Sequence, residues 1–472
     1  MKKLLLLLLY SPSLHAQTIN DYFEKIRHSA VELTAFFSQM PKGGDLHHHF
    51  SGSVYTETFI DAAVENDFYV HPITLAIRRE APVDTTGWTR FSKIKRDGLL
   101  FDFKQRLFRK WSARDYNETD YPSHRQFFES FDHFGPATDL SQEKGLLEIK
   151  SRAKAENVSY IETMFRVIRC NKDLGETTEV NSLFRSYQEK KDYSLTRRTL
   201  DSLYSQFQSM KVAECAIGFT QEYLHKLHAS LKLDDSSFTL RYQAFVIRLQ
   251  DPVTLFKNLV VAFEAADRSP LLVGVNIVAP EHYDVAMQDY WLHMQMFIYC
   301  KARYPNVKYS MHAGELTLGL VKPEDLTWHI SEAVYQAKPA RIGHGVDIAY
   351  EKENYALLEH MRAKDIPIEI NLGSNEFILK VKEDRHPILL YKRFNVPIVI
   401  STDDEGILRT NLIEQYVLLA SRYPAIKYAD IKRMVYNSIQ YSFIEEAEVK
   451  KRLRDNLDRD FKKFESMVMR YK

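Results

Sequence analysis

The segment GGDLHHHF at residues 43–50 contains three consecutive histidines before its last residue. It is the first of eight short runs of this kind along the chain. Each of the other seven is rich in apolar or β-branched residues, and five of them end on a polar residue. The eight runs are 43–50, 158–165, 238–248, 271–278, 307–312, 340–344, 366–371 and 396–402. Patterns with a helical period fill the stretches between them, for example at 252–266 and 355–363. This repeated strand and helix order predicts helices packed around a parallel sheet.

Eight such units favour a closed α/β barrel, the (β/α)8 or TIM type. The alternative is an open doubly wound sheet, which usually carries a glycine-rich phosphate-binding motif after its first strand. No such motif follows residues 43–50. We therefore predict a short N-terminal helix at 17–40 and a barrel at 41–472. A long aromatic and charged insertion, approximately 66–130, is expected to form a small subdomain or a lid, and a second insertion follows the second strand.

Composition and charge narrow the class of protein further. The 472 residues are 45% hydrophobic, which is enough for a sizeable core and excludes a disordered, collagen-like or coiled-coil chain. The 64 Lys and Arg residues nearly balance 63 Asp and Glu, so the formal charge of +1 favours neither nucleic acid nor anionic lipid as a partner. Cys170, Cys215 and Cys300 predict no disulfide framework and at most one disulfide. We expect a small-molecule partner.

The first sixteen residues predict a secretory signal peptide. Lys2 and Lys3 precede six consecutive leucines, which are followed by Pro12 and the small residue Ala16. The apolar run is too short for a stable membrane anchor, and no later stretch is long and apolar enough to span a bilayer. The alternative is an uncleaved amphipathic start. We predict cleavage after Ala16 and an exported protein, periplasmic or secreted, without a membrane anchor.

Four of the eight predicted strands end in residues that bind metals or move protons. Two of these residues share one face of the first strand, because side chains alternate along a strand. The others end or follow the fifth, sixth and eighth strands, on the rim where barrel enzymes keep their active sites. The set is His47, His49, His312, Glu315, His344, Asp403 and Asp404.

Three imidazoles and a carboxylate, without a thiolate, suit Zn²⁺ or a similar divalent ion that keeps one position for water. Such an ion lowers the pKa of bound water to about 7. Attack by the resulting hydroxide needs an acid and a carboxylate that fixes the substrate, and Glu315 and Asp404 can fill these roles. Each motif alone has a structural interpretation, such as a helix cap for the paired aspartates. Their joint placement favours a metal-dependent hydrolytic site.

The order of these motifs is also informative. The chain carries Leu46-His47-His48-His49, His312-Ala313-Gly314-Glu315, Arg341-Ile342-Gly343-His344-Gly345, Ser374-Asn375 and Ser401-Thr402-Asp403-Asp404. In this order and spacing they resemble the adenosine deaminase family, over about residues 40 to 445. The secretory start and the opening Met40-Pro41-Lys42-Gly43-Gly44 look closer to the secreted, growth-factor-related branch of that family.

The resemblance implies a barrel with one Zn²⁺ that hydrolyses adenosine or 2′-deoxyadenosine to inosine or deoxyinosine and ammonia. It implies that Glu315 protonates the purine ring nitrogen beside the attacked carbon. It also implies that His344 orients the metal-bound water, and that Asp404 holds this water and binds the imidazole-side nitrogen of the purine. The implied metal ligands are His47, His49, His312 and Asp403.

Two departures from the family pattern concern substrate selectivity. Ser51 stands where relatives often have an aspartate, and Ala279 stands where they have a glycine that offers its N–H to the purine. One alternative is therefore a deaminase of another 6-aminopurine, such as adenine or a modified nucleoside. Another is a nucleoside-binding or growth-factor-like protein with little turnover, although binding alone needs no general acid. Nucleic-acid editing is disfavoured, because its zinc enzymes use a Pro-Cys-x-x-Cys pattern and no two cysteines of this chain are near each other in the sequence. We expect a monomer or a homodimer.

Overall fold

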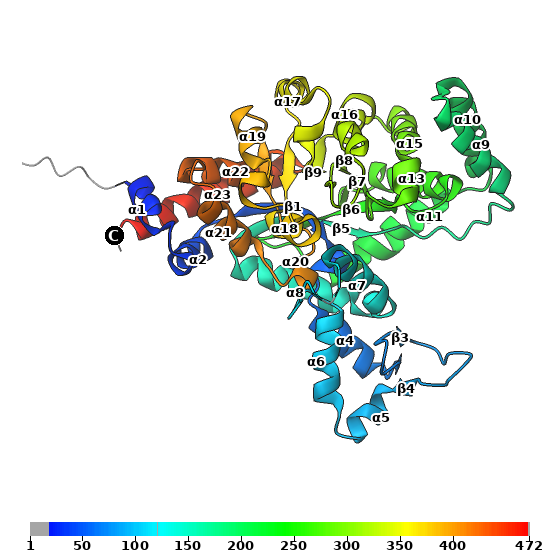
Figure 1. Cartoon of the computed structure of the whole chain (residues 1–472), viewed down its shortest axis with the longest axis horizontal. Helices are drawn as coiled ribbons and strands as arrows, with labels where there is room; N and C mark the ends of the chain where they lie inside the picture. Colours follow the sequence, from blue (N-terminus) through cyan, green and yellow to red (C-terminus); the bar gives the residue numbers. More distant parts are fainter. Residues whose placement is uncertain (1–17, 120, 471–472) are drawn as a thin grey trace, which may run out of the picture.

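Eight parallel strands lie at the centre of the computed structural model, which describes residues 18–119 and 121–470 (Figure 1). They are β1 (Gly43–His49), β5 (Val158–Arg166), β6 (Thr239–Ile247), β7 (Leu272–Val278), β8 (Lys308–Ala313), β9 (Arg341–His344), β10 (Ile368–Ile370) and β11 (Ile398–Ile400). Each strand pairs in parallel with the next one in this order. Six predicted runs contain their strand, and β5 and β8 each extend one residue beyond theirs, so the predicted strand order is confirmed.

The chain after β11 returns to β1 and nearly closes the sheet. His48 and Asp403 form a parallel bridge. The backbone N–H of Asp403 donates to His47 O at 2.9 Å, and the N–H of His49 donates to Asp403 O at 3.1 Å. The result is the predicted (β/α)8 barrel, and the closure places the end of β11 directly beside the histidines of β1.

Helices surround the barrel, and their apolar faces form one core with the strands. The residues of α13 (Pro252–Asp267) are nearly all buried, because this helix packs between β6, β7 and α15. The other helices of this layer are α8 (Gln142–Ala155), α15 (Tyr290–Arg303), α16 (His329–Glu332), η4 (Ala333–Ala337), α17 (Asn354–Ala363), α19 (Ile388–Arg393) and α22 (Tyr428–Gln440). Further helical segments are α3 (Phe50–Ser53), α4 (Thr56–Glu65), η1 (Asp139–Ser141), α14 (Asp284–Gln288), η3 (Pro323–Thr327), η5 (Ile348–Tyr350), α18 (Leu372–Leu379), η6 (Glu383–Arg385), α20 (Glu405–Leu408), α21 (Leu412–Arg422) and α23 (Ala447–Val468).

The first insertion has two parts, an arm that projects from the barrel (Figure 1) and a helix that lies beside the carboxyl ends of the strands. The arm contains a three-stranded antiparallel sheet with two helices. Its elements are β2 (Tyr69–Val70), β3 (Ile77–Arg78), β4 (Thr89–Arg90), α5 (Phe91–Arg96) and α6 (Leu100–Lys110). The chain then returns as α7 (Ser123–Thr138), which packs against α4 and α18 beside the carboxyl ends of the strands.

The second insertion is helical and is joined to the barrel by a disulfide. Cys170, just after β5, is bonded to Cys215, and their Cα atoms are 5.4 Å apart. The third cysteine, Cys300, is buried and unbridged. One bridge agrees with the predicted maximum. The insertion contains α9 (Thr178–Glu189), α10 (Tyr193–Ser209), α11 (Ala213–Ile217), η2 (Gly218–Leu224) and α12 (His225–Ser230).

The N-terminal segment differs from the prediction of one helix at 17–40, because the structure divides it into two. Ser29 begins the second helix, since its side chain accepts a hydrogen bond from the N–H of Glu32 at 3.3 Å. The side chain of Arg27 holds the break by donating to two backbone carbonyls that precede α22. The two helices are α1 (Ile19–Ile26) and α2 (Ala30–Gln39). The predicted signal peptide, residues 1–16, lies outside the described residues.

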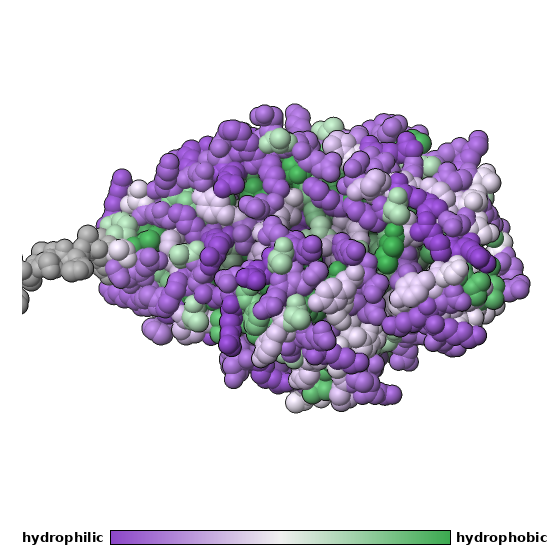
Figure 2. Space-filling model, turned by 90° about the horizontal axis from the view of Figure 1, so that it is seen from above, coloured by the Kyte–Doolittle hydropathy of each residue, from purple (hydrophilic) through white to green (hydrophobic). Residues whose placement is uncertain are grey.

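Within residues 18–119 and 121–470, none of the helices combines the length and the apolar character that crossing a membrane requires. Figure 2 shows one face of the molecule, which is mainly hydrophilic, with hydrophobic residues in small separate areas.

Candidate active site

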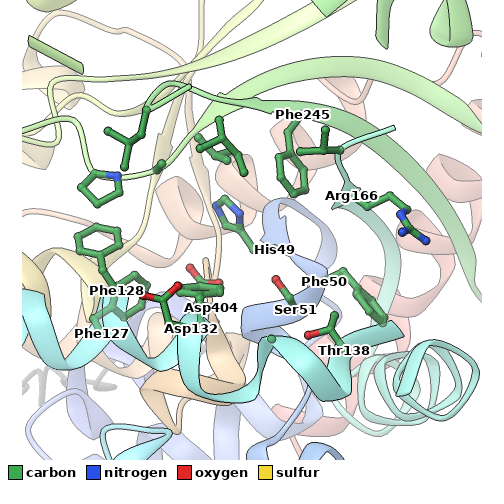
Figure 3. A pocket seen from close by; sticks show the side chains of 18 of the residues that line it. His49, Phe50, Ser51, Phe127, Phe128, Asp132, Thr138, Arg166, Phe245 and Asp404 are labelled. Carbon is green, nitrogen blue, oxygen red and sulfur yellow. The ribbon is translucent and has the colours of Figure 1, made fainter. Parts of the chain in front are cut away.

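The residues predicted from four strand ends surround the inner part of one cavity. This cavity has a volume of about 530 Å³, which lies within the range of about 300–1,000 Å³ usual for small-molecule sites. Aromatic side chains of α7 form much of one wall, opposite the carboxyl ends of β6 and β7 (Figure 3). Six of the seven predicted catalytic and metal-binding residues line it: His49, His312, Glu315, His344, Asp403 and Asp404. The seventh, His47, is buried directly behind them.

Four of these side chains lie as close together as the ligands of one metal ion. His49 Nε2 is 3.1 Å from His312 Nε2 and 3.2 Å from Asp403 Oδ1. His47 Nε2 is 3.5 Å from the same Oδ1 atom. Ligands that each lie about 2.0–2.2 Å from a tetrahedral ion are separated by about 3.3–3.6 Å. The spacing and the nitrogen and oxygen donors therefore fit a divalent ion of the zinc type.

Hydrogen bonds on the far side of two imidazoles turn their free nitrogens toward this position. His47 Nδ1 lies 2.7 Å from the carboxylate of Glu369, so Nδ1 carries the proton that is donated. His312 Nδ1 likewise donates to Asn276 Oδ1 at 3.0 Å. His47 Nε2 is buried and has no hydrogen-bond partner among the described residues. Such outer partners fix the tautomer that binds metal, so the orphaned nitrogen supports the fit.

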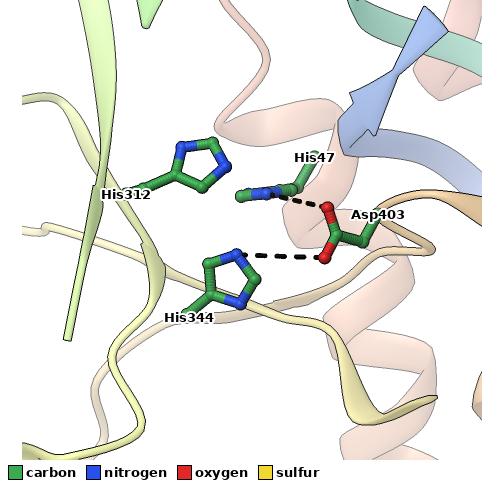
Figure 4. Close-up of side chains that lie close together, drawn as sticks. All are labelled: His47, His312, His344 and Asp403. Atoms are coloured by element: carbon green, nitrogen blue, oxygen red, sulfur yellow. Dashed lines mark ion pairs between the residues drawn. The ribbon is translucent and has the colours of Figure 1, made fainter. Parts of the chain in front are cut away.

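His344 points toward Asp403 (Figure 4), and its ring has the opposite tautomer. The N–H of Ile388 donates to His386 Nδ1 at 3.2 Å, so the proton of His386 is on Nε2 and is donated to Asn375 Oδ1 at 3.0 Å. The amide nitrogen of Asn375 then donates to His344 Nδ1 at 3.0 Å. The neutral His344 ring therefore carries its proton on Nε2, 3.9 Å from Asp403 Oδ2.

This tautomer separates His344 from the ligands. By distance alone, His344 could join His47, His312 and Asp403 around an ion, and His49 could join Asp403 and Asp404. A protonated Nε2 cannot coordinate a metal, however, but it can donate a hydrogen bond into the site. Burial lowers the pKa of His344 to about 3, which keeps this ring neutral. His47, His49, His312 and Asp403 are thus the ligand set that the geometry favours.

The charges around His47 attract a cation. Burial lowers the pKa of His47, but its contacts with Asp403 and Glu369 outweigh burial and raise it to about 10. Burial and the neighbouring His47 and His49 lower the pKa of His312 well below its usual value. The site thus holds one positive charge next to Asp403, and a bound ion would replace that proton.

The carboxyl of Glu315 is held ready to donate a proton. Burial raises its pKa well above the usual value, and the negative charges of Asp403 and Glu281 act in the same direction. Glu281 also fixes the loop, because its carboxylate accepts the N–H of Gly314 at 3.1 Å and that of Glu315 at 3.0 Å. A carboxyl group that stays protonated at neutral pH can act as a general acid.

Asp404 points into the cavity with one oxygen unused. Its Oδ1 atom is buried and has no hydrogen-bond partner within the described part of the chain. Burial and the adjacent Asp403 raise the pKa of Asp404 well above its usual value. The oxygen has room only because residue 52 is glycine, since a Cβ atom there would lie 1.6 Å from it.

Replacing Gly52 with Ala should therefore displace the Asp404 carboxylate. We expect kcat/KM to fall by about 10²-fold, the loss typical of a catalytic group that is misplaced by about 1 Å. Metal content should stay at the wild-type level, because Asp404 is outside the favoured ligand set. Gly218→Ala is the matched control, since a Cβ at Gly218 would meet nothing within 4 Å. Wild-type kcat/KM in Gly52→Ala would show that the position of Asp404 is unimportant.

A second prediction concerns the partner of His312. Asn276→Leu removes the oxygen that accepts the Nδ1 proton of His312, whereas Asn276→Asp keeps an acceptor there. We expect the leucine variant to bind the metal about 10–100-fold more weakly, and the aspartate variant to lie closer to wild type. Competition against a chelating dye measures both affinities. Unchanged affinity in Asn276→Leu would mean that this hydrogen bond does not orient the ligand.

Three residues at the site have left-handed backbone conformations that favour glycine. The φ angles are 89° at Ala279, 67° at His344 and 65° at Asp403. Such strain concentrates at functional sites, where the surrounding structure enforces it. Ala279 and Ser51, the two predicted substrate-binding residues, both line the cavity. Their contact with substrate stays a prediction.

Several residues of the site were not predicted from the sequence. Glu369 and Asn276 orient two ligands, Asn375 sets the tautomer of His344, and Glu281 fixes the loop of Glu315. Signals for two of them were available, because Glu369 and Asn276 are polar residues inside the predicted strands 366–371 and 271–278, where each needs a buried partner.

The comparison with known protein families agrees with this geometry. Residues 260–460 match the family model described as adenosine deaminase. Over this range, which is less than half of the chain, the protein is similar to the adenosine deaminase family. The matched range contains His312, Glu315, His344, Asp403 and Asp404, whereas His47 and His49 precede it. The fold brings those two histidines to the other five residues.

Known deaminases also align with part of the chain. An adenine deaminase of Agrobacterium fabrum is 29% identical over 187 residues, which are 39% of this chain and 52% of that protein. An adenosine deaminase of Clostridium kluyveri is 31% identical over 151 residues, 32% of this chain and 40% of that protein. The chain thus spans about half or less of the length of these relatives. An amidohydrolase of Burkhoderia ambifaria, solved with bound Zn, shares the fold at 18% identity, with a TM-score of 0.57 and coverage of 94% and 96%.

Proposed function

We propose that this protein is a metal-dependent deaminase that hydrolyses the 6-amino group of a purine nucleoside. The proposed substrates are adenosine and 2′-deoxyadenosine, and the proposed ion is Zn²⁺, one per chain. The observation that carries the proposal is that ring nitrogens of His47, His49 and His312 and the carboxylate of Asp403 surround one position. The protonated carboxyl group of Glu315 lies beside them. The family match and the Zn bound to the solved amidohydrolase support it.

An ion at this position would supply hydroxide at neutral pH by lowering the pKa of a bound water to about 7. Glu315 donates its proton to the purine ring nitrogen beside the carbon under attack, which makes that carbon more electrophilic. The Nε2–H of His344 donates a hydrogen bond into the same space, and Asp404 Oδ1 accepts one. Water and adenosine become inosine and ammonia.

The cavity can hold a flat purine away from solvent. Phe127, Phe128 and Phe131 of α7 line it, and the Phe128 ring packs 6.5 Å from that of Tyr283, which follows β7. Aromatic walls of this kind stack on a planar base and exclude water from it. The first insertion therefore provides the cover of the site, as well as the arm.

Adenine is the second candidate substrate, because one relative is an adenine deaminase. Ser51 and Ala279, which line the cavity, are the positions expected to affect this choice. Ultraviolet absorbance measures the deamination rates of adenosine, 2′-deoxyadenosine and adenine on the same metal-loaded protein. We expect both nucleosides to react at least tenfold faster than adenine. Faster reaction of the free base would replace the nucleoside proposal, and no reaction with any of the three would overturn the function.

We also propose that the protein is exported. The leader-like composition of residues 1–16 supports this, as does the Cys170–Cys215 disulfide, because disulfides persist mainly in oxidising compartments. Expression of the full sequence in a bacterial host followed by fractionation tests the proposal. We expect periplasmic protein with the mass of a chain that begins at Gln17. Cytoplasmic protein of full mass would contradict export.

A further inference from the structure

The cavity extends from the proposed metal position to two arginines that the deamination chemistry does not use. Arg166 is the last residue of β5, and Arg169 lies in the loop that the Cys170–Cys215 disulfide ties to α11. In Figure 3, Arg166 lies at one edge of the pocket, whereas His49 and Asp404 are nearer its centre. The Arg166 side chain is 21% exposed, so it is accessible from the cavity and partly shielded from bulk water.

The arginines at this edge outnumber their carboxylate partner. Asp139 lies 2.9 Å from Arg169, 3.4 Å from Arg166 and 3.9 Å from Arg79. One carboxylate can neutralise only one of these three charges. Of the two arginines that line the cavity, Arg166 makes the longer contact with Asp139. Its guanidinium also lies over the Tyr223 ring, 5.6 Å from the ring centre. Its guanidinium thus retains donors for another anion.

The other acids of the cavity lie apart from this edge or are already paired. Glu129 accepts hydrogen bonds from the Tyr121 hydroxyl and from Arg125. Asp132 is one to two helical turns before Asp139 and lies on the Asp404 side of the pocket in Figure 3. The acidic side chains of the cavity thus gather near the proposed reaction centre, whereas the far edge carries excess positive charge.

We propose that Arg166 and Arg169 form a subsite for an anionic group on the sugar of the 6-aminopurine substrate, so that a nucleoside monophosphate is preferred over the neutral nucleoside. The inference rests on the proposed function, which places the purine beside Asp404 and leaves the sugar side to face this edge. Arginine suits the role because its planar guanidinium binds phosphate and carboxylate oxygens through two parallel hydrogen bonds.

Calorimetric binding of reaction products tests the subsite without requiring turnover. Inosine, inosine 5′-monophosphate and the 5′-carboxylate of inosine are titrated into the metal-loaded protein. We expect the monophosphate to bind at least tenfold more tightly than inosine, with an advantage that shrinks as salt is added. Tighter binding of the carboxylate than of the phosphate would identify a carboxylate as the anion. Equal or weaker binding of both anions relative to inosine would overturn the proposal.

Two variants should move the affinity ratio of monophosphate to inosine in opposite directions. Arg166→Gln should lower the ratio by about tenfold or more, because it removes the guanidinium. Asp139→Asn should raise it, because it removes the carboxylate that competes for both arginines. Arg362→Gln, an exposed change of the same charge on α17, is the control and should leave the ratio unchanged.

If Arg166 and Asp139 form only a structural ion pair, Arg166→Gln and Asp139→Asn should both lower thermal stability and leave the affinity ratio at the wild-type value. That result would overturn the subsite. Failure of the subsite and failure of the proposed function are distinguishable. If adenosine is deaminated but anions gain no affinity, only the subsite is wrong. If the monophosphate binds tightly but no aminopurine is hydrolysed, the arginine subsite stands and the deaminase activity is wrong.

Discussion

Glu315→Gln should lower kcat by about 10²–10⁴-fold, the usual contribution of a general acid. Glutamine has nearly the same shape as glutamic acid but has no acidic proton to give to the purine ring. The carboxyl of Glu315 is buried, and its pKa is raised by burial and by Asp403 and Glu281. It is therefore protonated in the wild-type enzyme under conditions where an exposed glutamate would be ionised.

Two further measurements make the Glu315 result specific. Metal content should remain one ion per chain, because Glu315 is not in the favoured ligand set. Glu324→Gln, the same chemical change on an exposed residue of η3, should keep wild-type kcat. Full activity in Glu315→Gln would remove the general acid from the account, and loss of metal would reassign Glu315 as a ligand.

The raised pKa of Glu315 also predicts the direction of the pH dependence. The protonated carboxyl is the active form, so its population falls as the pH rises through the raised pKa. Wild-type kcat/KM should therefore fall on the alkaline side. The residual activity of Glu315→Gln should lack this decrease, because the amide does not titrate. An identical alkaline decrease in both proteins would show that another group controls it.

His49→Ala should remove the metal and with it most of the activity. His49 Nε2 is within 3.2 Å of Asp403 and 3.1 Å of His312, so its loss leaves two histidines and one carboxylate. A metal ion supplies several kcal/mol of transition-state stabilisation, so turnover should fall by about 10³-fold or more. Elemental analysis of the purified variant should find far less than one ion per chain.

The control for His49 is an exposed histidine outside the site. His28 lies between α1 and α2 on the surface, so His28→Ala should keep both metal and activity. A wild-type metal content in His49→Ala would show that His49 is not a ligand. His344 would then be the remaining candidate for the fourth metal ligand, and its Nε2 atom would have to be free of a proton.

The strands and the functional residues at their carboxyl ends could be predicted from the sequence. Short runs separated by helical patterns predicted all eight strands, and the parallel topology then placed His312 and Asp403 at the same rim. The break at Ser29 was missed because the apolar pattern continues across it. The serine is nonetheless a preferred helix N-cap, so a capping signal was present.

The partners that orient the site depend on contacts between distant strands. Glu369 is 322 residues from His47, and Asn276 is 36 residues from His312. Which residue of one strand faces which residue of another follows from barrel register and closure, and neither can be read from one sequence. The same limit applies to the tautomer of His344, which is set through Asn375 and His386.

We expect the protein to deaminate adenosine only when a metal ion is bound by His47, His49, His312 and Asp403. The most direct test follows the absorbance of adenosine with the purified protein as isolated, after removal of metal by a chelator, and after stoichiometric Zn²⁺ is restored. We expect conversion to inosine that stops on chelation and returns with one Zn²⁺ per chain. Conversion that continues in the metal-free protein, or no conversion with Zn²⁺ bound, would contradict this expectation.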